Sequence, residues 1–64
     1  VAYFNAYKGK SDSLVDALEA VGAKSDFAYR KKIAQKNKIT NYKGTAEQNG
    51  KLLALLKKGK LIKP

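Results

Sequence analysis

Apolar residues recur at helical spacing in three stretches of the chain, and each stretch begins with a residue that can cap a helix. The first apolar stripe comprises Leu14, Val15, Ala17, Leu18 and Val21. Ser13 before it can accept a hydrogen bond from an unpaired N–H of the first turn, and Gly22 after it tolerates the left-handed conformation that ends helices. The pattern predicts a helix over about 12–21.

The second stretch begins at Ser25 or Asp26 and carries a narrower stripe. Its apolar members are Phe27, Tyr29, Ile33 and Ala34. Asn37 is a residue that can adopt the left-handed position after a helix, with Ile39 as the apolar contact beyond it. A second helix is therefore expected over about 26–36.

The third stretch has the clearest start signal in the chain. Thr45 and Gln48 stand three residues apart, as in a capping box, and a leucine-rich face follows at Leu52, Leu53, Leu55 and Leu56. Gly59 then ends the pattern, which predicts a helix over about 45–58. Gly50 in its interior weakens such a helix by about 1 kcal/mol relative to Ala, unless another backbone has to come close there.

Both ends of the chain are predicted to be extended. Residues 2–7 are rich in aromatics and are followed by Gly9, whereas residues 60–63 form a short apolar and basic run before a terminal proline. Pairing of these two segments as short strands, packed on the helices, would hold both termini in place. The expected fold class is therefore α+β and mostly helical.

Composition restricts the chemistry that the chain can perform. With 64 residues it is one small domain with a thin core, and it contains neither Cys nor His. The usual zinc and copper ligands and the Ser-His and Cys-His catalytic pairs are therefore missing. Asp12 and Asp16 could be imagined as an acid and a base, but their place at a helix start explains them. We expect a binding module with no catalytic residue, cofactor or metal.

Charge is distributed unevenly along the chain. The formal net charge is +9, yet residues 1–22 carry two lysines against three acids, so all of the excess lies after Gly22. Such a basic block indicates a nucleic acid, a membrane surface or another anionic polymer as partner, or merely a solubilising surface. There is no apolar run of 18 residues that could span a membrane, and no signal peptide. The missing initiator Met indicates a fragment whose neighbour lies on its N-terminal side.

Candidate ligand-binding residues cluster around the loop at 40–44. Tyr42 lies there among polar neighbours, where an aromatic face beside amide and ammonium donors would suit a sugar ring. The alternative is that Tyr42 packs the loop onto the helices with its hydroxyl in water. The basic run in the second helix either faces a polymer or is a solvated face. The predicted binding set is Arg30, Lys31, Asn41, Tyr42, Lys43, Gln48 and Asn49.

Two strings in this chain carry a resemblance to a known family. They are Tyr29-Arg30-Lys31-Lys32-Ile33-Ala34 and the run from Asn41 to Asn49 that reads Asn-Tyr-Lys-Gly-Thr-Ala-Glu-Gln-Asn. With the leucine-rich tail, they resemble the C-terminal cell-wall-binding domain of Bacillus phage and prophage endolysins, also called the amidase C-terminal domain. The resemblance extends from about Tyr7 to Lys63.

The resemblance implies a non-catalytic module, 1–64, at the C-terminus of a lytic enzyme. Its N-terminal partner domain would be an N-acetylmuramoyl-L-alanine amidase or a lysozyme-type muramidase. The module would be made in the cytoplasm of the host and act at the cell wall, on Gram-positive wall polysaccharide or peptidoglycan. The apolar face of the third helix also allows a homodimer.

Two other functions remain as alternatives. A small basic helical domain could bind nucleic acid, although no helix combines Arg with Asn or Gln on one face for base readout. The leucine face and flanking lysines of residues 52–60 also fit an interfacial membrane helix, but the capping signals of three helices favour a folded domain.

Overall fold

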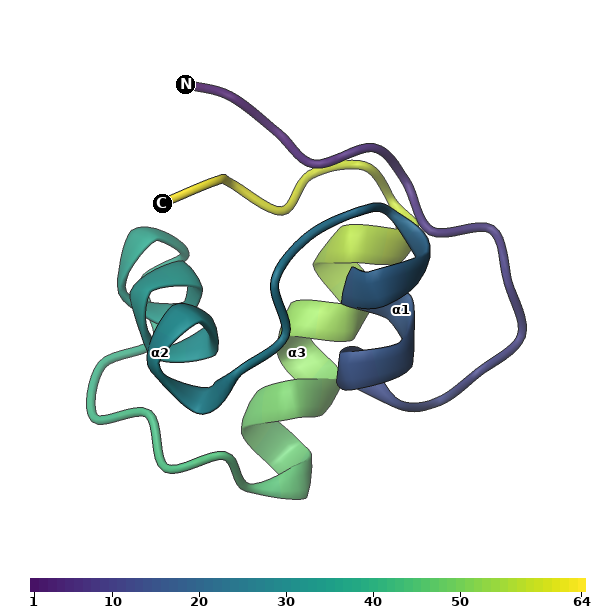
Figure 1. The fold of residues 1–64 in the computed structure, drawn as a ribbon. Coiled ribbons are helices and arrows are strands. Elements are labelled where there is room, and N and C mark those ends of the chain that lie inside the picture. Colours follow the sequence, from purple (N-terminus) through teal and green to yellow (C-terminus); the bar gives the residue numbers. More distant parts are fainter.

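A computed structural model describes residues 1–64 and contains three α-helices (Figure 1). These are α1 (Leu14–Ala20), α2 (Phe27–Lys36) and α3 (Ala46–Lys57). Each is one to two residues shorter at an end than the sequence predicts, because the capping residues themselves lie outside the helix. α1 packs directly on α3, and α2 lies on the other side of α3.

All three helices begin where the capping signals place them. Ser13 accepts a hydrogen bond from Asp16 N at 3.3 Å, and Asp26 accepts one from Tyr29 N at 3.2 Å. Thr45 and Gln48 form the complete capping box, in which each side chain binds the backbone of the other. Helix starts are thus determined by contacts between residues only three positions apart.

The end of α2 differs from the prediction. Asn37 keeps a negative φ, and it is Lys38 that adopts the left-handed conformation, at φ 67°. The side chain of Asn37 instead accepts a hydrogen bond from Ile62 N at 2.9 Å and donates to Ile62 O at 3.1 Å. Asn37 therefore attaches the C-terminal segment to α2.

The predicted terminal strands are absent, so the fold is all-α and the α+β prediction is wrong. The two terminal segments do lie side by side (Figure 1), but they share one isolated antiparallel bridge, between Tyr3 and Ile62. Pairing is limited to two backbone hydrogen bonds, from Phe4 N to Leu61 O at 2.9 Å and from Lys63 N to Ala2 O at 2.7 Å. Ile62 N faces away from Tyr3 and donates to Asn37, and farther along the N-terminal segment Tyr7 N donates to Leu56 O of α3 at 3.1 Å. Each segment is thus also bonded to the helical part of the chain, and the pairing between them stays too short to form a strand.

The core joins all three helices to the terminal segments. Its buried members are Phe4, Leu14, Ala17, Leu18, Ile33, Ala34, Tyr42, Leu52, Leu53, Leu56 and Leu61. Phe4 and Leu61 come from the two terminal segments, and burial of each large side chain contributes about 2 kcal/mol. The terminal segments therefore complete the core without forming a sheet. None of the helices has the length and apolar character needed to cross a membrane.

Candidate functional site

The loop between α2 and α3 has the backbone geometry of a tight connection. Asn41 and Gly44 both adopt left-handed conformations, at φ 57° and φ 75°. Asn tolerates this conformation because its short amide can bond locally, and Gly because it has no Cβ. A Cβ on Gly44 would lie 3.3 Å from Cε1 of Phe27, so the loop lies close to the first turn of α2.

Tyr42 is part of the core rather than an open stacking surface. Only 4% of it is exposed, and its ring lies 5.5 Å from that of Phe27, centroid to centroid, with the planes tilted by 34°. Its hydroxyl donates to Asn49 Oδ1 and accepts from Arg30 Nη1 at 3.2 Å. The hydroxyl is therefore bonded to two side chains, and the ring holds the loop on α2 and α3.

The amides of the predicted binding set bond within the chain. Gln48 Oε1 accepts from Lys43 N at 2.7 Å, while its Nε2 donates to Asn41 O at 3.2 Å. Asn49 Nδ2 donates to Gly44 O at 3.4 Å. The structure thus brings Arg30, Asn41, Tyr42, Lys43, Gln48 and Asn49 together, but through bonds that shape the loop.

Phe27 is an exposed aromatic beside this cluster that sequence reasoning placed in the apolar stripe. It is 47% exposed, and the guanidinium carbon of Arg30 lies 5.8 Å from its ring centroid. Phe27 is two turns before the buried Ala34 and so shares its face, but at that end of α2 only the loop covers it. Its position at the first residue of α2 is the signal that could have indicated its exposure.

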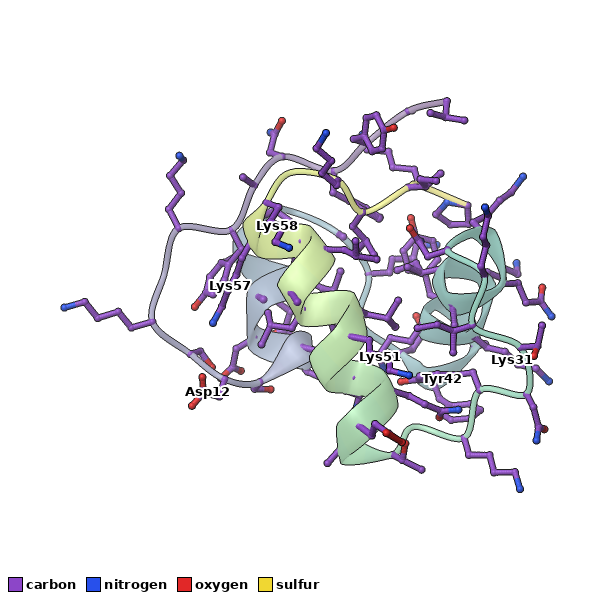
Figure 2. The ribbon with its side chains drawn as sticks, turned by 180° about the vertical axis from the view of Figure 1, so that it is seen from behind. Asp12, Lys31, Tyr42, Lys51, Lys57 and Lys58 are labelled. Atoms are coloured by element: carbon purple, nitrogen blue, oxygen red, sulfur yellow. The ribbon has the colours of Figure 1, made fainter.

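Exposed lysines extend along α3 and α2. Figure 2 shows Lys51 and Lys57 on α3, Lys58 directly after its end, and Lys31 on α2. Among all the lysines, Lys57 alone has a carboxylate within 4.0 Å, that of Asp12. The remaining ammonium groups are available to an anionic partner.

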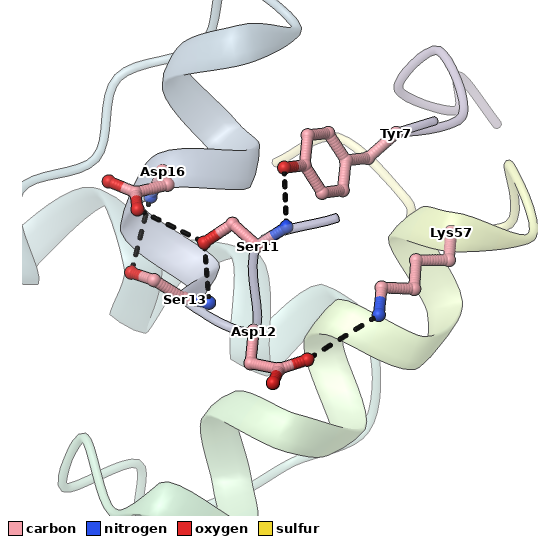
Figure 3. Close-up of polar contacts among 6 residues, drawn as sticks. All are labelled: Tyr7, Ser11, Asp12, Ser13, Asp16 and Lys57. Carbon is pink, nitrogen blue, oxygen red and sulfur yellow. Dashed lines mark hydrogen bonds and ion pairs between the residues drawn. The ribbon is translucent and has the colours of Figure 1, made fainter. Parts of the chain in front are cut away.

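The acidic residues near α1 serve the local structure (Figure 3). Asp16 Oδ2 accepts from Ser11 Oγ at 3.0 Å, and Ser11 N donates to the Tyr7 hydroxyl at 3.0 Å. Asp12 reaches Lys57 across to α3. These contacts hold the segment before α1, and no three acidic side chains come together as a metal site.

A surface cleft of about 460 Å³ lies away from the predicted loop, where the terminal segments face the α1–α2 connection and α2. Its apolar lining comes from Phe4, Val21, Ala23 and Tyr29. Its more polar lining comes from Asn5, Gly22, Lys24 and Lys63. Sequence reasoning missed this cleft because its walls come from three segments far apart in the chain.

The polar side chains of this cleft have no partner within the chain. The amide of Asn5, the ammonium of Lys24 and the hydroxyl of Tyr29 make no hydrogen bond or ion pair to another residue. Lys63 Nζ lies 5.7 Å from the centroid of the Phe4 ring and has no carboxylate partner. No acidic residue lines the cleft. It is therefore a concave surface with free donors and positive charge.

Comparison with curated proteins relates the chain to a phage protein. Over 47 residues, 73% of this chain, it is 53% identical to the L-alanyl-D-glutamate peptidase of Listeria phage A118. The match covers 17% of that peptidase, so the chain corresponds to only a small part of the relative's length. The identity supports a relationship to phage lysins, and the relative is named as a peptidase rather than the expected amidase or muramidase. No family model and no solved structure matches the chain.

Proposed function

We propose that this chain is the non-catalytic cell-wall-binding module of a phage lysin, which holds a hydrolytic domain on the polysaccharide or peptidoglycan of a Gram-positive wall. The observation that carries the proposal is the 53% identity to a stretch that makes up only 17% of a phage peptidase. A segment of this size, shared with a larger hydrolase, is the size of an accessory domain. The attached domain would be a hydrolase, as the relative is.

The side chains of the module support binding rather than catalysis. The chain has no His or Cys, the carboxylate of Asp16 is hydrogen-bonded at the start of α1, and that of Asp12 is exposed and lies 4.0 Å from Lys57. A nucleophile–base pair of the common Ser-His or Cys-His type therefore cannot form. The hydrolytic step of the lysin is accordingly assigned to another domain.

The basic surface provides the first stage of wall binding in this proposal. Lys31, Lys51 and Lys58 are exposed and unpaired, and a bacterial wall rich in anionic polymers would attract them over roughly a Debye length. Of the predicted binding set, Lys31 and Lys43 belong to this surface. Tyr42, Gln48 and Asn49 support binding indirectly, by holding the loop that carries Lys43.

The direct test is decoration of cells by a fluorescent fusion of residues 1–64. The fusion should label intact Bacillus or Listeria cells, and part of the labelling should persist at moderate salt because short-range contacts are screened less than long-range attraction. Absence of labelling at both low and moderate salt would refute the wall-binding function. Binding to duplex DNA that survives above physiological salt would instead favour the nucleic-acid alternative.

A further inference from the structure

The geometry points to the cleft between the terminal segments and the α1–α2 connection as the ligand subsite, and to an anion-bearing sugar unit as its ligand. This inference rests on the proposed wall-binding function and gives it a location and a ligand chemistry. The cleft lies apart from the loop cluster that the sequence singles out.

The size and lining of the cleft fit one segment of a wall polymer. Its volume of about 460 Å³ falls within the roughly 300–1,000 Å³ that is usual for small-ligand sites, enough for about one or two sugar units. Val21 and Ala23, which are partly exposed, supply apolar surface against which the C–H face of a sugar can pack. Asn5 and Tyr29 supply an amide and a hydroxyl for the sugar hydroxyls.

The charge of the cleft specifies an anion. Lys24 and Lys63 line it from the two sides, one from the α1–α2 connection and one from the C-terminal segment, and no carboxylate lies between them. The backbone N–H groups of Asn5 and Lys24 also have no acceptor within the chain. Charge-assisted hydrogen bonds from ammonium groups to an oxyanion are roughly twice as strong as neutral ones.

The availability of donors distinguishes the cleft from the loop cluster. In the loop cluster, the Tyr42 hydroxyl and the Gln48 and Asn49 amides are already bonded to one another or to the loop backbone. A ligand that bonds to these groups would have to break those bonds, and the unpaired donor of the cluster, Arg30 Nε, is buried. In the cleft the side-chain donors make no hydrogen bond within the chain, so a ligand can bond to them without disrupting the fold.

The same oxyanion chemistry has two sources in a Gram-positive wall. One is the phosphodiester of a polyol-phosphate or sugar-phosphate polymer, and the other is the carboxylate of peptidoglycan. In the first the oxyanion lies within the polyol or sugar chain, and in the second it lies on the peptide attached to the glycan. The two sources can be distinguished by comparing binding to untreated walls with binding to walls from which hydrofluoric acid has removed the phosphodiester-linked polymers.

The test compares two charge-matched double variants in binding to purified walls. Lys24→Gln/Lys63→Gln removes the two cleft ammonium groups. Lys8→Gln/Lys10→Gln removes two exposed lysines that belong neither to the cleft nor to the basic surface of α2 and α3, and it leaves the same net charge. We expect the cleft variant to bind at least about tenfold more weakly, and the control to change by less than about twofold. Thermal unfolding should be similar for both, since all four lysines are exposed.

Each outcome bears on a different claim. If the wild-type domain binds walls and both variants lose the same affinity, binding is general electrostatic attraction and the cleft assignment is wrong while the wall function stands. If the wild-type domain does not bind walls, the wall function and the cleft assignment both fail. Loss confined to the cleft variant supports the assignment.

A second measurement locates the ligand without any substitution. Titration of the ¹⁵N-labelled domain with glycerol 3-phosphate or with glucuronate should shift the backbone amides of Asn5, Gly22 and Lys24 before those of the 41–49 loop. Shifts confined to the loop would overturn the assignment. Retention of binding on acid-stripped walls would identify the carboxylate source, and its loss the phosphodiester source.

Discussion

Replacement of Gly50 by Ala is expected to stabilise this domain. Gly50 lies in the interior of α3, in an exposed position, and a Cβ built on it meets no atom within 4 Å. Glycine lowers stability here through its flexibility in the unfolded chain, and no contact in the folded chain requires its small size. Ala at a helix-interior site is about 0.8–1.0 kcal/mol more favourable than Gly.

The size of the domain makes this difference measurable. In domains of 60–100 residues, 1 kcal/mol shifts the Tm by about 4–8 °C, so the variant should melt roughly 3–8 °C higher. Thermal unfolding followed by far-UV circular dichroism, with urea unfolding as a second measure, provides the assay. The midpoint should rise without a change in the urea m-value, because no buried surface is altered.

The matched control is the same substitution at Gly44. There φ is 75° and the new Cβ would lie 3.3 Å from Phe27 Cε1, so Gly44→Ala combines left-handed strain with a close contact. It should lower stability by about 1–2 kcal/mol. Two identical chemical changes should thus act in opposite directions. A fall in Tm for Gly50→Ala in the isolated domain would show that the helix-propensity reasoning is wrong.

Three further predictions test the packing. Tyr42→Phe leaves Arg30 Nη1 and Asn49 Oδ1 without their shared hydrogen-bond partner, so urea unfolding should show a loss of about 1–3 kcal/mol in stability. The folded fraction should bind walls normally. An unchanged unfolding midpoint would contradict these hydrogen bonds. Asn37→Ala removes both hydrogen bonds to Ile62 and should lower the free energy of unfolding by a similar amount. Hydrogen exchange at the Ile62 amide should be faster than in the wild type. Unaltered exchange there would argue against the attachment of the C-terminal segment to α2. Asp12→Asn should leave the unfolding midpoint unchanged, because this carboxylate is fully exposed and lies 4.0 Å from Lys57 Nζ. A clear loss of stability would mean that the ion pair is stronger than its geometry indicates.

The position of the helices could be predicted because their signals are local. Ser13, Asp26 and Thr45 each accept a hydrogen bond from the backbone three residues later, a distance along the chain that sequence reading resolves. The terminal segments could not be assigned in this way. Their aromatic and apolar residues are compatible with strands, but whether a ladder forms depends on which distant acceptor binds each N–H.

The same difference between local and distant contacts decides how much of the candidate site could be predicted. Tyr42, Gln48 and Asn49 lie together because the loop and the capping box make them neighbours in the sequence. The bond from Tyr42 to Asn49, and the bonds of Gln48 and Asn49 to the loop backbone, became visible only in the structure. The exposure of Phe27 depended on how far the loop covers the start of α2.

By itself, the sequence determined the three capped helices, the basic excess after Gly22 and the lack of His and Cys, because each depends on residue identity or on contacts within one helical turn. Tertiary structure alone decided that the termini meet at a single bridge and that Tyr42 is buried. It also decided that Asn5, Lys24 and Lys63 line one cleft. These outcomes depend on which of several distant partners each group finds when the core closes, and no local pattern encodes that competition.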